Sequence, residues 1–204
     1  VQGLEQAGFR YGGGEIVCTV ELAGDLGEAP PDVQVVTMTN AHLPAAQRIA
    51  ADTHAHNRFA YDVHFERERV DRVWGELLAR QLADPGSGTL VAEHTDGTLL
   101  GFITWCRNRR LEARTGRGLG SLDFIGVRHD RQSRGVGDLL NRRALQVLRR
   151  EGVERVTVRT MITNYEALSV LRKIGMRVTA SNQLLHRWLE RPQTRTPLCP
   201  EDPQ

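Results

Sequence analysis

The chain has 204 residues, of which 40% are hydrophobic and 25% charged, and a formal net charge of +2. This length suits one large domain, or one ordinary domain with an additional segment. The composition is that of a globular protein and argues against disorder and against a basic coat for nucleic acid. No apolar run approaches the roughly 20 residues that cross a bilayer, and the N-terminus has no signal-peptide pattern, so we expect a cytoplasmic protein.

Cysteine and histidine usage argues against a disulfide framework and against a metal. Cys18, Cys106 and Cys199 are widely spaced and form no C-x-x-C pair, which fits a reducing compartment. Three histidines lie between residues 54 and 64, but they match no fixed ligand spacing and have no neighbouring cysteine. We therefore expect no bound metal.

The first half of the chain predicts a linker, a strand and two helices. Residues 23–32 are rich in Gly, Pro and acidic side chains and predict a linker. Alternating residues then predict a strand over 33–39, followed by a Pro-initiated helix over 43–53. A second helix is predicted over 70–82, because its apolar residues recur at three and four positions before the breaking triplet 84–86.

The second half predicts a hairpin and then alternating strands and helices. The β-rich runs 89–93 and 99–105 flank Asp96-Gly97, a pair that favours a tight hairpin turn. Five arginines between 107 and 117 predict a solvated loop. Further strands are expected at 119–127, 155–159 and 184–189, and further helices at 136–150 and 165–174. This order predicts a mixed α/β sheet that is covered by helices on both faces.

One stretch, a strand that runs into a Gly-rich turn and then a helix, predicts a ligand site. It reads Ile125-Gly-Val-Arg-His-Asp-Arg-Gln132-Ser-Arg-Gly135-Val-Gly137. Glycines allow the backbone to approach a ligand, and the first N–H groups of a helix favour phosphate. The dinucleotide fingerprint fails because Leu140 stands in place of its third glycine, and no P-loop lysine is present. The pattern predicts an anionic cofactor, with an ordinary tight turn as the alternative.

The wider pattern resembles the GNAT superfamily of N-acetyltransferases. Gln132-x-x-Gly135-x-Gly137 after a hydrophobic strand is similar to the acyl-CoA pyrophosphate loop, and Asn164-x-x-Ala167-x-x-Val170-Leu171-x-x-x-Gly175-Met176 is similar to a second GNAT signature. The resemblance covers about residues 33–190. It implies a GNAT fold, an α/β domain with a mixed, mostly antiparallel sheet flanked by helices on both faces.

A narrower resemblance points to TDP-fucosamine and related amino-sugar acetyltransferases. It is carried by Asn57-Arg58-Phe59-x-x-Asp62, Val158-x-Thr160-x-x-x-Asn164 and His186-x-Trp188. It implies a nucleotide-linked amino sugar as the acceptor.

The GNAT resemblance also implies acetyl-CoA as cosubstrate and assigns residues to it. Ile125, Gly126 and Val127 would pair with the pantetheine arm, with one N–H polarising the thioester carbonyl, and Asn164 would hydrogen-bond the pantetheine. The pyrophosphate would be held, mainly by backbone N–H groups, by Gln132, Ser133, Arg134, Gly135, Val136 and Gly137.

Acyl transfer to an amine requires a neutral nucleophile and a way to protonate the departing thiolate. Asp123 lies two residues before Ile125, so strand alternation places both on one face, where a carboxylate can accept the ammonium proton. A structural ion pair with an arginine is the alternative role. The general-acid tyrosine of the family is replaced by Leu171, which shares a helical stripe with Val170 and Ile174 and so predicts core packing. A thiol pKa of about 8.5 allows solvent to protonate the thiolate.

The segment 54–64 lies between the first two helices, where GNAT proteins line the acceptor pocket. Arg58 and Asp62 suit a polar, partly anionic acceptor such as a nucleotide-linked amino sugar. The arginines of 107–117 are a second, weaker candidate for phosphate recognition.

The sequence therefore predicts an N-acyltransferase that uses acetyl-CoA and a small-molecule amine, without nucleic acid, membrane or metal; a homodimer stays open. Alternatives are another amine acceptor (an antibiotic, a polyamine or a protein N-terminus), a non-catalytic acyl-CoA-binding regulator, and a nucleic-acid-binding module. Three parts are expected: 1–32, 33–190 and a flexible tail at 191–204. Leu4-x-x-x-Gly8-Phe9-Arg10 has the form of Leu171-x-x-x-Gly175-Met176-Arg177, so 1–32 is interpreted as the tail of a degenerate GNAT-like half, or as a chance match. The first interpretation implies a natural chain that begins before Val1.

Overall fold

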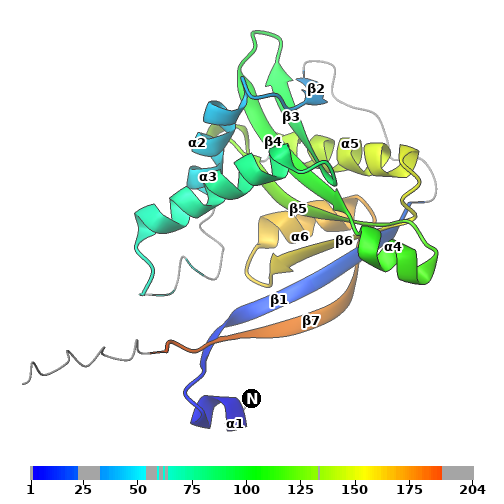
Figure 1. Ribbon diagram of the computed structural model, residues 1–204. Coiled ribbons are helices and arrows are strands. Elements are labelled where there is room, and N and C mark those ends of the chain that lie inside the picture. Colours follow the sequence, from blue (N-terminus) through cyan, green and yellow to red (C-terminus); the bar gives the residue numbers. More distant parts are fainter. Residues whose placement is uncertain are drawn as a thin grey trace, which may run out of the picture.

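The computed structural model describes residues 2–22, 33–53, 59, 62, 64–132 and 134–189 (Figure 1). The helices are α1 Gln2–Gln6, α2 Leu43–Thr53, α3 Arg67–Ala83, α4 Arg109–Thr115, α5 Val136–Arg150 and α6 Tyr165–Lys173, with a 3-10 turn at His129–Arg131. The strands are β1 Arg10–Glu21, β2 Val33–Thr37, β3 Ser87–His94, β4 Leu99–Arg107, β5 Leu119–Val127, β6 Arg155–Met161 and β7 Arg177–His186. None of the described helices has the length and apolar content of a bilayer span.

The strands form one mixed sheet in the order β2-β3-β4-β5-β6-β1-β7. Neighbouring strands are antiparallel except β5 and β6, which run parallel. One face is covered by α5 and α6 and the other by α2 and α3 (Figure 1). The mixed sheet with helices on both faces is confirmed.

Two apolar cores, one on each face, hold these layers together. Leu140, Leu145 and Leu148 of α5 are fully buried against the sheet, because the apolar residues of this helix recur at three and four positions. On the other face, Phe102 contacts Phe124 edge to face at 4.8 Å between ring centroids. The sheet is therefore buried on both sides in its central strands.

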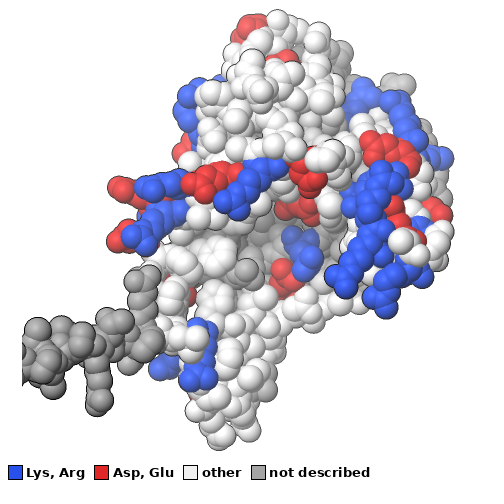
Figure 2. Space-filling model, viewed as in Figure 1, with Lys and Arg blue, Asp and Glu red and all other residues white. Residues whose placement is uncertain are grey.

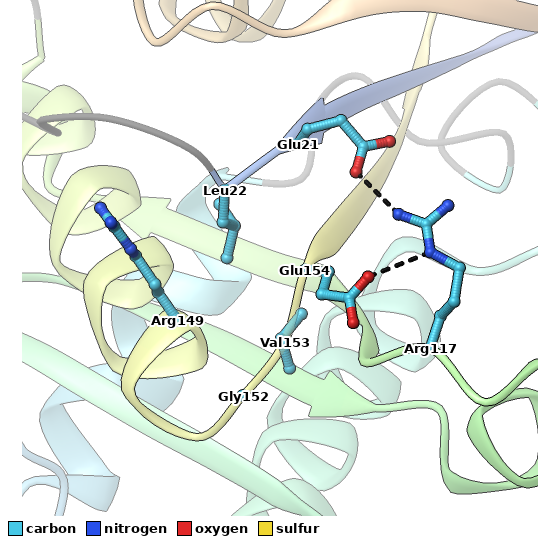
Figure 3. Close-up of a pocket in the computed structure, with 7 residues that line it drawn as sticks. All are labelled: Glu21, Leu22, Arg117, Arg149, Gly152, Val153 and Glu154. Atoms are coloured by element: carbon cyan, nitrogen blue, oxygen red, sulfur yellow. Dashed lines mark hydrogen bonds and ion pairs between the residues drawn. The ribbon is translucent and has the colours of Figure 1, made fainter.

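The N-terminal strand β1 lies inside the sheet, between β6 and β7 (Figure 1). Its C-terminal end is fixed by Arg117, whose guanidinium donates to Glu21 at 3.1 Å and to Glu154 at 3.0 Å (Figure 3). Leu22 is buried and its N–H donates to the carbonyl of Glu154. The division at residue 32 stays a prediction, but the segment before it supplies an inner strand.

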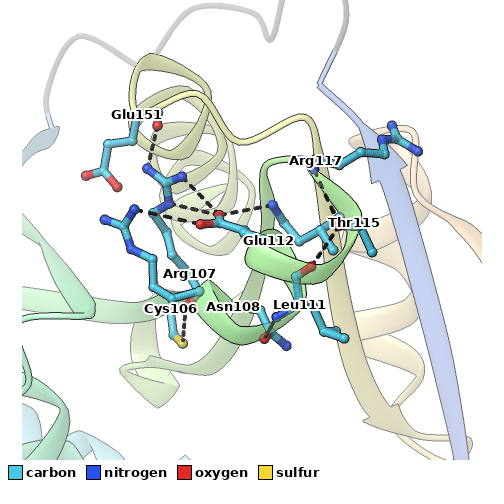
Figure 4. A network of polar contacts seen from close by, with 10 residues as sticks. Cys106, Arg107, Asn108, Leu111, Glu112, Thr115, Arg117 and Glu151 are labelled. Atoms are coloured by element: carbon cyan, nitrogen blue, oxygen red, sulfur yellow. Dashed lines mark hydrogen bonds and ion pairs between the residues drawn. The ribbon is translucent and has the colours of Figure 1, made fainter.

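The arginine-rich stretch predicted as a loop contains a helix, α4. Asn108 caps its first turn by accepting from the N–H of Leu111, and Gly116 ends it in the left-handed conformation. Arg107 donates to Glu112 and to the carbonyl of Glu151, and the exposed fractions of the Arg107 and Glu112 side chains are only 16% and 13% (Figure 4). The loop prediction was wrong here, because Asn108 and Gly116 cap a short helix. The charge of Arg107 is drawn into an ion-pair network, whereas the other arginines of the stretch are exposed, namely Arg109, Arg110, Arg114 and Arg117.

Candidate functional site

The parallel strands β5 and β6 separate partway along their length. They pair only from Leu119 opposite Arg155 to Leu122 opposite Val158, whereas β4 stays paired with β5 as far as Val127. Beyond Leu122, the edge of β5 that faces β6 therefore has backbone groups outside the ladder. Ile125, Gly126 and Val127, predicted to pair with pantetheine, lie in this separated part.

Asp123 lies where the two strands begin to separate. It is an extra residue in β5, since Leu122 pairs with Trp105 and Phe124 with the adjacent Thr104. This bulge changes the alternation: Leu122 packs in the core beneath α5, and Phe124 packs in the core beneath α2. Strand alternation therefore cannot be used to place Asp123 on the same face as Ile125, because the bulge interrupts the alternation between them. Asp123 is exposed, and its role as a base stays a prediction.

Asp123 also acts on a neighbouring thiol. Burial raises the pKa of Cys106, and the negative charges of Asp123 and Asp84 raise it further. Cys106 and the buried Cys18 are both free thiols. Neither has the lowered pKa of a reactive cysteine, so neither is a candidate nucleophile.

The Gly-rich turn leads into the N-terminus of α5. Gly135 is the N-cap residue with φ 84°, and no side chain among the described residues caps the helix. The N–H groups of Val136 and Gly137 in the first turn are thus available to an anion, and the positive helix end adds to the attraction. A Cβ atom built on Gly135 meets nothing within 4 Å, so the turn is open.

The other predicted loop residues have different surroundings. The side chain of Gln132 donates to the carbonyl of Val127 at 3.3 Å, so it fixes the end of β5. Arg134 is exposed, and Ser133 lies outside the described residues. The separated edge of β5 and the uncapped end of α5 fit the pantetheine and pyrophosphate of acetyl-CoA.

The second signature places Asn164 and Leu171 on α6. Asn164 caps this helix by accepting from the N–H of Ala167 at 3.1 Å, which leaves its amide NH2 as a donor toward a ligand. Leu171 is 3% exposed and packs in the core, as its stripe predicts. Tyr165, at the helix start, is 74% exposed.

The acceptor segment meets the end of β7 at a single carboxylate. Asp62 accepts from the N–H and ring Nδ1 of His64, at 3.1 and 2.9 Å, from Nδ1 of His186 at 3.1 Å and from Nε1 of Trp188 at 3.2 Å. Burial alone would raise the pKa of Asp62, but these hydrogen bonds together hold it well below its usual range. Arg58 lies outside the described residues.

Aromatic rings surround this carboxylate. Phe65 packs edge to face on Phe59 at 5.0 Å and contacts Trp188 at 4.9 Å, while His64 stacks on Trp188 at 4.7 Å. A cavity of about 420 Å³ opens here, lined by Phe59, Phe65, Leu184, Leu185, His186, Arg187 and Trp188. Figure 2 shows that the molecular face is hollowed between α3 and the lower β1–β7 arm. In the sequence, only the narrower resemblance pointed to His186 and Trp188. The spacing of Phe59 and Phe65 along the sequence did not predict that their rings line a cavity.

Charge is distributed unevenly over the rest of this face. Figure 2 shows arginine and acidic side chains interspersed along α3, whereas arginine predominates around α4. Arg107 and Arg117 are both engaged in ion pairs with glutamates. Within the part of the chain that the structure describes, no three His, Cys, Asp or Glu side chains are placed to hold a metal ion.

Comparison with known proteins places this architecture in a family. Residues 45–176 match the model of the Acetyltransferase (GNAT) family. A mycothiol acetyltransferase of Saccharomonospora viridis is 30% identical over 121 residues, which are 58% of this chain and 39% of that protein. A GCN5-related N-acetyltransferase structure from Sphaerobacter thermophilus matches with a TM-score of 0.65 and 21% identity, over 90% of this chain and 54% of that one.

A second structure, a GCN5-related N-acetyltransferase from Kribbella flavida, matches with a TM-score of 0.55 and 25% identity, over 74% of this chain and 86% of that one. The chain thus spans about half, or less, of the mycothiol acetyltransferase and of the Sphaerobacter protein. The family match covers more than half of the chain and agrees with the mixed sheet. The chain belongs to the GNAT family of acetyltransferases.

Proposed function

We propose that this protein transfers an acetyl group from acetyl-CoA to the amine of a small polar molecule. The observation that carries the proposal is the separated edge of β5 beside the uncapped N-terminus of α5. Ile125, Gly126 and Val127 would pair with the pantetheine arm, while the backbone at Gly135, Val136 and Gly137 would hold the pyrophosphate. The thioester then supplies the acetyl group, which the neutral amine attacks.

Asp123 is the proposed proton acceptor for the amine. The support is its position at the bulge where β5 leaves β6, together with its exposure, which lets it take a proton directly or through water. Leu171 offers no acid, so the thiolate would take its proton from solvent. Asn164 would donate to the pantetheine through its amide NH2.

The proposed acceptor is an amino sugar, with a nucleotide-linked form as the finer hypothesis. The support is the resemblance of three short motifs to amino-sugar acetyltransferases, of whose residues Asp62, His186 and Trp188 meet in one cluster. A non-catalytic acyl-CoA-binding regulator is the second candidate, favoured by the buried leucine at the family's tyrosine position.

Two measurements test the proposal. Isothermal titration should show acetyl-CoA binding, and CoA release should be measured with D-glucosamine, putrescine and glycinamide. Asp123→Asn should lower kcat about 100-fold, the lower range for losing a positioned base, while acetyl-CoA binding is unchanged. Binding without turnover of any amine would support the regulator, and absence of acetyl-CoA binding would refute both candidates.

A further inference from the structure

The segment formed by α1 and β1 repeats the backbone geometry of α6 and β7. Leu4 and Gly8 of the first segment correspond to Leu171 and Gly175 of the second, at a distance of 167 positions in both cases. Each glycine has a left-handed backbone, with φ 84° at Gly8 and 82° at Gly175. In each segment the N–H group after the glycine donates to the carbonyl of the leucine, at 3.0 Å in the first and 2.9 Å in the second. The two helices therefore end in the same capping motif, which favours a true repeat over a chance match.

The ladder between β1 and β7 is symmetric about its centre. When each residue is replaced by its counterpart 167 positions away, every pair of the ladder becomes another pair of the same ladder. The pairs that exchange in this way are Arg10/His186 with Thr19/Arg177, Tyr11/Leu185 with Cys18/Val178, Gly13/Leu184 with Val17/Ala180, and Gly14/Gln183 with Ile16/Ser181. The central pair, Glu15 and Asn182, maps onto itself, and the extra residues at the two bulges, Gly12 and Thr179, correspond as well. A local two-fold axis thus relates β1 to β7.

This two-fold axis leaves β7 one partner short. β1 pairs with β7 along one edge and, over its residues 15–21, with β6 along the other. The corresponding residues of the last strand are 182–188, but β7 is the final strand of the sheet, and its outer edge has no partner in the part of the chain that the structure describes. An unpaired edge is a template for another strand. By symmetry, the strand that fits this edge is antiparallel to β7 and is the equivalent of β6.

Apolar residues near the free edge are exposed, although their counterparts lie in the core. Leu4 is 45% exposed, whereas Leu171 is 3% exposed. Leu189 is 76% exposed, whereas its counterpart Leu22 is 8% exposed. Leu171 and Leu22 pack in the core that α5 and α6 form with the sheet, while α1 has no buried residue and lies at the far end of the β1–β7 arm (Figure 1). Leu4 and Leu189 therefore lack the sheet and helices that cover their counterparts.

We propose that a second GNAT-like sheet, which precedes α1 in the natural chain, binds the surface formed by α1, Leu189 and the outer edge of β7 from Asn182 onward. The equivalent of β6 in that unit pairs with β7 and leads through a helix into α1, as β6 leads through α6 into β7. β1 and β7 then become the two central strands of one continuous sheet. An intact second copy of this chain does not fit the edge in this way, because its own β6 is already paired with β1. The proposal does not depend on the acetyl transfer.

The test compares residues 1–204 with the protein translated from the natural gene, including everything encoded before Val1. Hydroxyl-radical footprinting, read by peptide mass spectrometry, measures how fast each side chain reacts. In the longer chain Leu189 should react about tenfold more slowly, since its exposed fraction should fall from 76% to the 8% of Leu22. Leu4 should be protected in the same way.

Val178 is the matched control on the same strand. It is 61% exposed and its counterpart Tyr11 is 59% exposed, so the symmetry predicts no protection at this position. Leu189→Asp should lower the Tm of the longer chain and leave that of residues 1–204 unchanged, whereas Val178→Asp should change neither.

Three results would overturn the proposal. The first is a natural chain that begins at Val1, and the second is an equal reaction rate of Leu189 in the two chains. The third is protection of Leu189 in residues 1–204 that grows with protein concentration, because a second copy would then cover the surface. None of these readouts involves acetyl-CoA, so failure of the proposed function would be seen separately.

Discussion

Gly135 connects backbone conformation to acetyl-CoA binding and allows a matched test. It has φ 84° at the N-cap of α5, while Gly116 has φ 68° at the C-cap of α4. A Cβ atom at either position meets nothing within 4 Å. Alanine at each site therefore imposes the same backbone strain without a steric clash, but only Gly135 adjoins the proposed pyrophosphate site.

The expected loss of stability is small and similar for the two variants. The left-handed conformation costs a residue with a Cβ atom about 1–2 kcal/mol, and the stiffer unfolded chain offsets roughly 0.4–1 kcal/mol of this. The net loss of about 1 kcal/mol corresponds to a fall in Tm of about 2–4 °C for a chain of this size. Gly116→Ala should show this fall and nothing more.

Gly135→Ala should in addition weaken acetyl-CoA binding. Relief of the strain turns the peptide groups that follow, so the N–H groups of Val136 and Gly137 lose their aim at the pyrophosphate. A hydrogen bond to a charged group contributes about 1.5–3 kcal/mol, so one lost bond raises Kd about 10- to 100-fold. Titration calorimetry with acetyl-CoA measures this, and equal Kd values for the two alanine variants would refute the pyrophosphate site.

Three further predictions concern charge. Glu112→Gln should destabilise the fold by about 2 kcal/mol in urea unfolding, because Arg107 keeps a shielded charge without its counterion; unchanged stability would show that the network is dispensable. The hydrogen bonds that lower the pKa of Asp62 stabilise the folded protein fully when the pH is above about 3.9, the usual pKa of an aspartate. This stabilisation is lost as the pH falls further, through the lower pKa that Asp62 has in the folded state. The stability difference between wild type and Asp62→Asn should thus shrink from pH 7 to pH 3, and a constant difference would contradict it. Asp123→Asn should lower the pKa of Cys106 and so speed alkylation of this thiol at pH 8, which peptide mass spectrometry measures for each cysteine separately. An unchanged alkylation rate would show that the charge of Asp123 does not affect Cys106.

The elements with a strong period were predictable from the sequence. The helix expected at 136–150 and the strand expected at 119–127 have the same bounds in the structure. In α5 the apolar residues recur at three and four positions and most of them pack in one core, so local pattern and tertiary burial agree. The final strand was displaced, expected at 184–189 but found at Arg177–His186, because its first seven residues are exposed and carry no alternating pattern.

Other features depend on contacts between distant parts of the chain. The bulge at Asp123 arises from the pairing of β5 with β4, and no residue type in the strand marks it. The bond between Asp62 and His186 joins residues 124 positions apart. The acceptor segment was predicted as a region through the family resemblance, but the aromatic cavity required the fold.

The place of β1 explains how the separation of β5 from β6 can persist. Beyond Val158, β6 loses β5 as a partner, yet Arg159, Thr160 and Met161 remain paired with Val17, Ile16 and Glu15 of β1. A strand with both edges unpaired would expose its backbone groups and have little to hold it in line. The N-terminal strand therefore supports the far wall of the proposed acetyl-CoA site. Because β1 also pairs with β7, it joins that wall to the last strand of the sheet.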